Sequence, residues 1–485
     1  MIGTSPARSQ ELGARLTEIT RGVLRPPSTV KYTDDLDGLL TRHTVRVLVV
    51  PNLTNYFIDR GTERGLSYDS FMLFGSYLER VNRPLPKPGT APRSGKSEVT
   101  KIQVVFIPVP RDRILQALVE GRGDIAAANL TITTSRSQYV DFTNPVVTDV
   151  DEIVVRGPGA PELRTLDDLA GQTVHVRRST SYYESLQALN ARFTAAGKTP
   201  MRILFLPDEI ENEDKLEMLN AGLIKLAVIE EPLFQFWKQV FPNIRSSGLV
   251  LRRDADIAWA VRRGNPRLRS ALNQFLATYY NEKSGARTLI FSRYLQTTMW
   301  VKPVDGRREL ARFDDSVEFF RRYSGQYGFD YLLVLAQGFQ ESHLNQTYVS
   351  PAGAIGLMQV MPKTGREMQV GDIRMADPNV HAGTRYLRQL VDTYFNEPQL
   401  TPLNRMMFAF ASYNAGPGRV QRLRDEAQHL GFDRNVWFGN VELVVADRIG
   451  REPIQYVRNI LKYYVAYSLI DEVGKERSRT RELLK

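Results

Sequence analysis

The chain has 485 residues, which is more than one ordinary hydrophobic core organises, so we expect at least two folding units. With 42% hydrophobic and 24% charged residues, its composition is that of a soluble globular protein and excludes a largely disordered chain. Cysteine is absent, which excludes disulfide frameworks, thiolate zinc sites and Cys nucleophiles. A formal net charge of +10 favours an anionic partner or serves solubility alone. No Lys/Arg run interleaves with aromatic residues, so we expect no nucleic acid partner.

Residues 1–43 are expected to form an N-terminal extension. This segment has no apolar region typical of an export signal, and the chain has no stretch of 18 apolar residues. As written, the sequence therefore predicts neither a membrane span nor an export signal.

Residues 44–292 alternate short β-rich runs with helical patterns. The predicted strands are 44–50, 102–109, 151–156, 173–178, 202–207 and 226–230, and the predicted helices are 67–82, 111–121, 181–193 and 213–222. This alternation predicts an α/β domain whose mostly parallel sheet is covered by helices on both faces. A turn-rich passage at 156–171 divides it into two lobes, the second at about 157–250, and a crevice between lobes is a usual ligand site.

The character changes after a linker predicted at 293–312. Residues 313–485 show helical patterns at 316–328, 331–343, 381–395, 405–416 and 453–473, without a convincing strand. We therefore expect a C-terminal all-α domain.

One carboxylate in this helical part stands out. On the predicted helix 331–343, Val334, Gly338 and Glu341 share one stripe, so the acid lies among apolar and small residues. A desolvated carboxyl has a raised pKa and can donate a proton near neutral pH. The plainer interpretation is a helix-end Glu that reaches solvent. The following turn favours catalysis, because Gly353 and Gly356 allow close backbone approach to a ligand.

"ESHLNQTYVSPAGAIGLMQVMPKT" resembles the signature of the soluble lytic transglycosylase-like domain, which is related to goose lysozyme and cleaves peptidoglycan. Further matches follow in order at "DPNVHAGTRYLRQL", "ASYNAGPGRV" and "EPIQYVRNILKYY". The resemblance implies that Glu341 is the catalytic acid and base. It also implies a glycan groove lined by Ser342, Met358, Gln359, Tyr413, Asn414, Glu452 and Tyr456.

The resemblance explains a carboxylate without an acidic neighbour. Hydrolysing glycosidases generally need a second carboxylate. If the N-acetyl group and the 6-hydroxyl of the sugar take that role, one carboxylate protonates the leaving oxygen and later accepts the hydroxyl proton. Cleavage of the MurNAc-GlcNAc β-1,4 bond then leaves a 1,6-anhydro-MurNAc end and consumes no water. Such a reaction is that of a carbon-oxygen lyase. The alternatives are a lysozyme-like hydrolase and a non-catalytic solute-binding or cell-wall sensor protein.

"VEGRGDIAAANLTITTSRSQYVDFTNPVV" resembles the central signature of family 3 periplasmic solute-binding proteins. In that family the Arg at the position of Arg136 clamps a ligand carboxylate with two parallel donors. Glu231 is the expected partner of a ligand ammonium, although a slipped alignment would give Glu230 this role. The other expected ligand contacts are the hydroxyls of Thr131 and Thr133 and, at a helix N-terminus that favours an anion, Ser179, Thr180 and Ser181.

The two domains in this order resemble the membrane-bound lytic murein transglycosylase F type. The resemblance implies murein glycan strands as the substrate, an amino acid or muropeptide as a regulatory ligand, peripheral membrane association, and the periplasm, often the outer membrane, as location. We expect no cofactor, and because the five histidines show no ligand spacing, no metal site.

Overall fold

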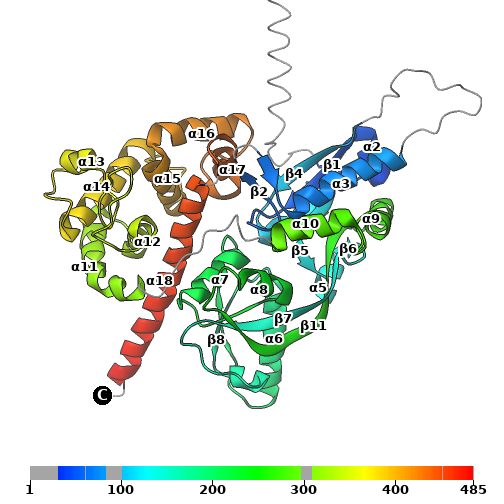
Figure 1. Cartoon of the computed structure of the whole chain (residues 1–485), viewed down its shortest axis with the longest axis horizontal. Helices are drawn as coiled ribbons and strands as arrows, with labels where there is room; N and C mark the ends of the chain where they lie inside the picture. Colours follow the sequence, from blue (N-terminus) through cyan, green and yellow to red (C-terminus); the bar gives the residue numbers. More distant parts are fainter. Residues whose placement is uncertain (1–30, 60–61, 83–100, 297–308, 451, 484–485) are drawn as a thin grey trace, which may run out of the picture. The chain divides into compact units, whose positions relative to one another are not determined.

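The computed structural model describes residues 31–59, 62–82, 101–296, 309–450 and 452–483. The chain divides into two compact units. Unit 1 comprises Met1–Val146, Ile257–Tyr294 and Leu423–Arg451, and unit 2 comprises Val147–Asp256, Leu295–Arg422 and Glu452–Lys485. Each unit thus joins one lobe of the strand-containing half to a part of the helical half. The element labels are those of Figure 1.

The first lobe, in unit 1, is built on a sheet with the order β4-β1-β5-β11, to which β6 adds by pairing with β11. Its strands are β1 (Thr44–Val49), β4 (Gln103–Pro108), β5 (Ile125–Thr131), β6 (Val140–Phe142) and the end of β11 (Arg245–Arg262). A small hairpin joins β2 (Phe57–Asp59) to β3 (Thr62–Arg64). The helices of unit 1 are α2 (Leu36–Arg42), α3 (Leu66–Val81), α4 (Ile114–Val119), α5 (Thr134–Ser137), α9 (Pro266–Thr278), most of α10 (Gly285–Leu295) and α17 (Glu442–Arg448).

The second lobe, in unit 2, has the sheet order β11-β7-β10-β8-β9. Its strands are β7 (Val147–Arg156), β8 (Thr173–Val176), β9 (Arg202–Phe205) and β10 (Leu226–Glu230), and its helices are α6 (Ser181–Ala195), α7 (Asn212–Asn220) and α8 (Glu231–Trp237). β8 runs parallel to β9 and β10, whereas β7 runs antiparallel to β10 and β11 runs antiparallel to β5 and β6. The sheets are therefore mixed, which corrects the expectation of a mostly parallel sheet.

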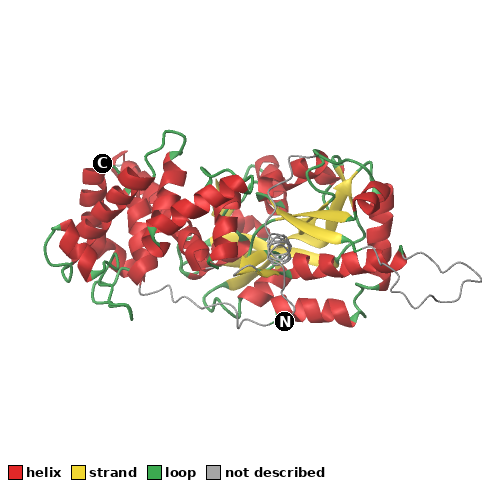
Figure 2. Cartoon of the chain, turned by 90° about the horizontal axis from the view of Figure 1, so that it is seen from above, coloured by secondary structure: helices red, strands yellow, loops and turns green. Residues whose placement is uncertain are grey.

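The helical half contains no strand among the described residues, and Figure 2 shows it as helices joined by loops. Its helices are α11 (Glu309–Tyr327), α12 (Tyr331–Ser342), α13 (Pro362–Met368), α14 (Ala376–Tyr394), α15 (Pro402–Ala415), α16 (Pro417–His429) and α18 (Glu452–Leu483). Within unit 2, α12 packs against α11 and α18, and α15 packs against α14 and α18. The core between them consists of fully buried apolar side chains such as Val334, Phe408 and Ile460.

The domain boundaries proposed from the sequence stay a prediction. Most of the linker 293–312 and most of the extension 1–43 lie outside the described residues. Where the extension is described, Asp35 caps the first turn of α2 by accepting from the Leu36 backbone N–H at 2.8 Å.

Candidate active site

Glu341 lies at the C-terminal end of α12, a helix that begins at an aspartate cap. Asp330 accepts a hydrogen bond from the Leu332 backbone N–H at 3.0 Å. Val334 and Gly338, two turns and one turn before the acid respectively, are buried, as the predicted stripe requires. Gly338 is needed for packing, because a Cβ there would lie 2.6 Å from the Phe320 ring. Glu341 itself is half-buried at the end of this apolar stripe.

Within the part of the chain that the structure describes, the carboxyl group of Glu341 accepts one side-chain hydrogen bond, from a residue of α18. The Tyr456 hydroxyl donates to Glu341 Oε1 at 2.5 Å, and Gln337 Nε2 donates to that hydroxyl oxygen at 3.0 Å. Gln337 is buried and stands one helical turn before the acid. The three side chains therefore form a line from Gln337 through Tyr456 to Glu341, which fixes the direction of the tyrosine hydroxyl.

Burial raises the pKa of the Glu341 carboxyl to about 7, and the hydrogen bond from Tyr456 opposes this rise. Burial and the negative charge of Glu341 also raise the pKa values of Tyr456 and Tyr413, so both phenols stay protonated as donors. Among the described residues, no second carboxylate and no cationic side chain contributes to the pKa of Glu341. The site thus holds one acid that can be protonated near neutral pH.

The loop after α12 is held in place by a serine and an asparagine. The chain leaves the helix through left-handed backbone at His343, and the Ser342 hydroxyl donates to the Leu357 carbonyl at 3.0 Å. Asn379 on α14 accepts from the Met358 N–H at 2.8 Å and donates to the Ile355 carbonyl at 2.8 Å. These bonds tie the loop residues 355–358 to α12 and α14.

Four of the predicted groove residues belong to this loop or bond to it. Ser342 is buried and contributes a structural bond. The Met358 side chain is fully buried, and its place in a glycan groove stays a prediction. Its carbonyl oxygen accepts from the Tyr413 hydroxyl at 2.7 Å. Gln359 is buried, and its amide donates to the Gly356 carbonyl at 2.9 Å.

Asn414 and Glu452 differ from these four residues in that their side chains are exposed to solvent. Both side chains are exposed, Asn414 in the last turn of α15 and Glu452 at the start of α18. Neither has a hydrogen-bond or ion-pair partner in the described part of the chain. Their amide and carboxylate groups are therefore available to solvent or to a ligand.

Sequence reasoning missed Gln337 and Asn379 as parts of the site. For Gln337 a signal was present, because it precedes Glu341 by four residues and so lies on the same helix face. Asn379 carried no such signal, since its contacts with residues 355–358 are long-range.

In the first lobe, the predicted ligand residues Thr131, Thr133 and Arg136 lie together at the end of β5. Thr133 caps α5 by accepting from the Arg136 backbone N–H at 3.3 Å, and Arg136 Nη1 donates to the Thr131 carbonyl at 2.9 Å. Both threonines are buried and Arg136 is half-buried. The guanidinium is therefore held against the strand end, as a preorganised carboxylate clamp would be.

In the second lobe, the predicted residues 179–181 start α6. Thr180 is the N-cap position, although its hydroxyl donates to the Arg177 carbonyl at 2.9 Å, and the Ser179 hydroxyl donates to Asp208. Glu231 is exposed on α8, whereas Glu230 is buried and accepts from the Tyr182 hydroxyl. The structure thus places Glu230, the alternative to Glu231, in the interior of the lobe.

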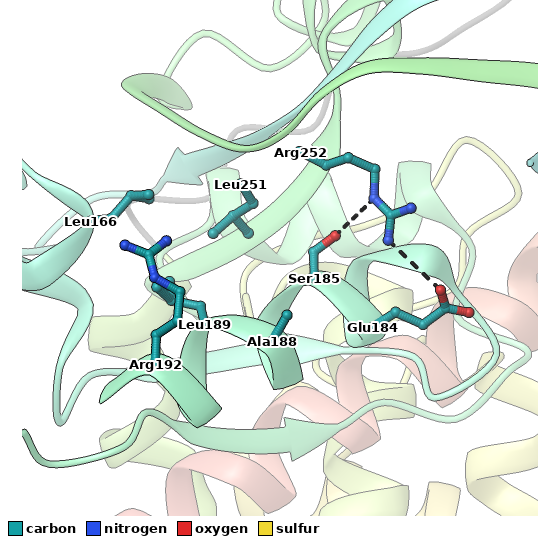
Figure 3. A pocket seen from close by; sticks show the side chains of 8 residues that line it. All are labelled: Leu166, Glu184, Ser185, Ala188, Leu189, Arg192, Leu251 and Arg252. Carbon is teal, nitrogen blue, oxygen red and sulfur yellow. Dashed lines mark hydrogen bonds and ion pairs between the residues drawn. The ribbon is translucent and has the colours of Figure 1, made fainter. Parts of the chain in front are cut away.

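A pocket of about 200 Å³ lies between α6 and β11 of the second lobe (Figure 3). Arg252 Nε donates to Ser185 Oγ at 3.1 Å at its rim, and Arg252 pairs with Glu184 at 3.7 Å. Leu189 and Leu251 are among its apolar lining residues. None of the predicted ligand residues lines this pocket.

Within the described ranges, no helix combines the length and the apolar content needed to cross a bilayer.

Two family models match the chain in sequence order. The model of bacterial extracellular solute-binding proteins, family 3, matches residues 96–297, and the transglycosylase SLT domain model matches residues 318–436. Among solved structures, an ancestral amino acid-binding protein, a precursor of cyclohexadienyl dehydratase, is similar with 20% identity and a TM-score of 0.41, covering 54% of this chain and 98% of that chain.

Curated relatives match most of the chain. A protein of Desulfosudis oleivorans named membrane-bound lytic murein transglycosylase F is 29% identical over 435 residues, which cover 86% of this chain and 88% of the relative. A protein of the same name from Shewanella sp. (strain MR-4) is 25% identical over 475 residues, covering 94% and 91%. The chain therefore carries a family 3 solute-binding domain followed by a transglycosylase SLT domain, and over most of its length it is a homologue of the membrane-bound lytic murein transglycosylase F proteins.

Proposed function

We propose that the protein is a peptidoglycan lytic transglycosylase in which Glu341 acts first as the acid and then as the base. The observation that carries this proposal is the Glu341 carboxyl group at the end of α12, which has no carboxylate partner among the described residues and whose pKa burial raises to about 7. At neutral pH a large fraction of this group is protonated, as general-acid catalysis requires. Its homologues carry the name of this activity.

In the first step, the protonated carboxyl donates its proton to the glycosidic oxygen between MurNAc C1 and GlcNAc O4, and the C1–O bond breaks. In the second step, the carboxylate accepts the proton of the MurNAc 6-hydroxyl while that oxygen bonds to C1. The acid is restored, and the 1,6-anhydro ring forms without water. The hydroxyl of Tyr456 stabilises the carboxylate between the two steps, because it donates directly to Oε1.

The experiment compares the parent with Glu341→Gln on purified sacculi. Mass spectrometry of the released muropeptides should show 1,6-anhydro-MurNAc ends for the parent and a loss of about 10²- to 10⁴-fold in rate for the variant. Reducing MurNAc ends from the parent would favour the hydrolase. Equal rates for parent and variant would exclude Glu341 as the acid, and an inactive parent would favour the sensor protein.

We further propose that the solute-binding half holds an amino acid or a muropeptide, with the Arg136 guanidinium on a ligand carboxylate. The support is its held position against Thr131 and the family 3 match. Ligand regulation of the helical half requires that the ligand favour one conformation over another. A thermal-shift screen with single amino acids and muropeptides should find a stabilising ligand whose effect Arg136→Ala abolishes.

The domain boundaries 44–292 and 313–485 and a location in the periplasm at the outer membrane are part of the same proposal. The name of the relatives supports a membrane association. Fractionation of cells that express the full chain tests this location.

A further inference from the structure

Helix α7 of the second lobe and helix α18 of the helical half pack against each other within unit 2. Their contact centres on Lys462, whose side chain is completely buried. Lys462 Nζ donates to Glu217 Oε2 at 2.6 Å and to Asn459 Oδ1 at 3.0 Å. The Tyr463 hydroxyl donates to the other oxygen of Glu217 at 3.1 Å. One carboxylate of α7 thus accepts hydrogen bonds from two consecutive residues of α18.

A buried ammonium group is costly unless it is paired, so the burial of Lys462 depends on its contacts with Glu217 and Asn459. Glu217 is only 18% exposed, which limits screening of the pair by solvent. Asp214, one turn earlier on α7, is also buried; burial raises its pKa, and the charges of Lys462 and Arg458 oppose that rise. The two acids of α7 therefore face positive side chains of α18.

The same segment of α18 leads to the reacting acid. Tyr456, which donates to Glu341, precedes Tyr463 by two helical turns and lies on the same helix face. The Tyr463 ring also packs on Phe339 of α12, with ring centroids 4.4 Å apart at 64°. Phe339 stands two residues before Glu341. Tyr463 therefore contacts both the carboxylate of α7 and the helix that carries the acid.

We propose that Glu217, although it belongs to the solute-binding half, is a positioning residue for the reaction at Glu341. By binding Lys462 and Tyr463, Glu217 fixes the rotation of α18 about its axis and the position of α18 along that axis. It thereby keeps the Tyr456 hydroxyl in hydrogen-bonding position to Glu341. This inference rests on the proposed function. Hydrogen bonds weaken when the donor moves out of line with its acceptor, so a movement of α18 that carries the Tyr456 hydroxyl away from Glu341 Oε1 weakens this bond.

The test uses the full chain with Glu217→Gln, which keeps the shape and removes the charge, and with Lys462→Met as a second variant. The matched control is Asp167→Asn, which removes an exposed ion pair of the same lobe, Asp167 to Lys198 at 2.5 Å. The measurement is kcat for release of anhydro ends from sacculi between pH 5 and pH 9, in the parent background and in the Tyr456→Phe background.

In the parent background we expect kcat to fall roughly threefold to thirtyfold in Glu217→Gln and in Lys462→Met, with no change in the control. The alkaline limb of the pH profile should move in the same direction as in Tyr456→Phe. In the Tyr456→Phe background, Glu217→Gln should have little further effect, because the bond through which it acts is already gone.

An unchanged kcat and pH profile in Glu217→Gln would overturn the inference. So would equal losses in both backgrounds, since Glu217 would then act independently of Tyr456. If the Glu217→Gln variant does not fold, the Lys462→Met variant is judged by the same two criteria. A parent that releases no anhydro ends would overturn the proposed function, and this inference with it, a result distinct from the other two.

Discussion

Replacing Glu341 with Gln should stabilise the protein at alkaline pH, although it lowers the rate of the proposed reaction by about 10²- to 10⁴-fold. The carboxyl has its ordinary pKa of 4.5 in the unfolded chain, and burial raises this pKa to about 7 in the folded one. The folded state thus favours the protonated form, so the parent loses stability as the pH rises from about 4.5 to about 7. Gln has no proton to lose and can still accept from Tyr456.

The size of this effect follows from the two pKa values. At about 1.4 kcal/mol per pKa unit, the difference corresponds to roughly 3 kcal/mol above pH 7 and to almost nothing below pH 4. For a domain of 150–250 residues, 1 kcal/mol moves Tm by about 2–4 °C, so Glu341→Gln should melt roughly 6–12 °C higher than the parent at pH 8.

Differential scanning calorimetry of both chains between pH 4 and pH 8 measures this difference directly. A difference in Tm that stays constant over this range would refute the reasoning, because Glu341 would then titrate alike in the folded and unfolded chains. A gain in stability with a loss of activity is the usual pattern at a strained catalytic group.

Two other changes probe the hydrogen bond and the loop. Tyr456→Phe removes the donor that favours the carboxylate, so the pKa of Glu341 should rise further and the alkaline limb of the pH–rate profile should move up by about one pH unit; an unmoved limb would contradict the role of this bond. Gly356→Ala should lower the free energy of unfolding by about 1–3 kcal/mol, since its φ is +75° and a Cβ would lie 2.5 Å from Gln346 and 2.6 Å from Asn379. Gly353→Ala is the control, because its φ is +86° with open space around it, and equal losses in both variants would show that crowding plays no part.

The sequence predicted local elements well where one period dominates. Strands β1 and β10 and helices α3 and α12 match their predicted ranges within about two residues. The sequence did not predict β11, which is 18 residues long. Its polar run Arg252-Arg253-Asp254 interrupts the alternation of buried and exposed positions by which a strand is predicted. The antiparallel direction of β7 and β11 was missed as well, because strand direction depends on pairing between residues distant in sequence.

In the candidate site too, residues with a local sequence pattern could be predicted, and residues that depend on long-range contacts could not. Glu341 could be predicted from its position on a helix stripe and from the motif that follows it. Its partner Tyr456 is 115 residues away, and no local pattern indicates that its hydroxyl reaches Oε1. That Glu230 is buried and Glu231 exposed could not be predicted either, since a shift of one residue at the end of a strand decides which side chain is buried.

The central claim is that one carboxylate cleaves the glycan without water. Digestion of sacculi in oxygen-18-labelled water, followed by mass spectrometry of the products, tests it most directly. The account predicts MurNAc ends that carry the anhydro ring and no label from water. Labelled reducing ends as the main product would contradict it, because water would then have attacked C1.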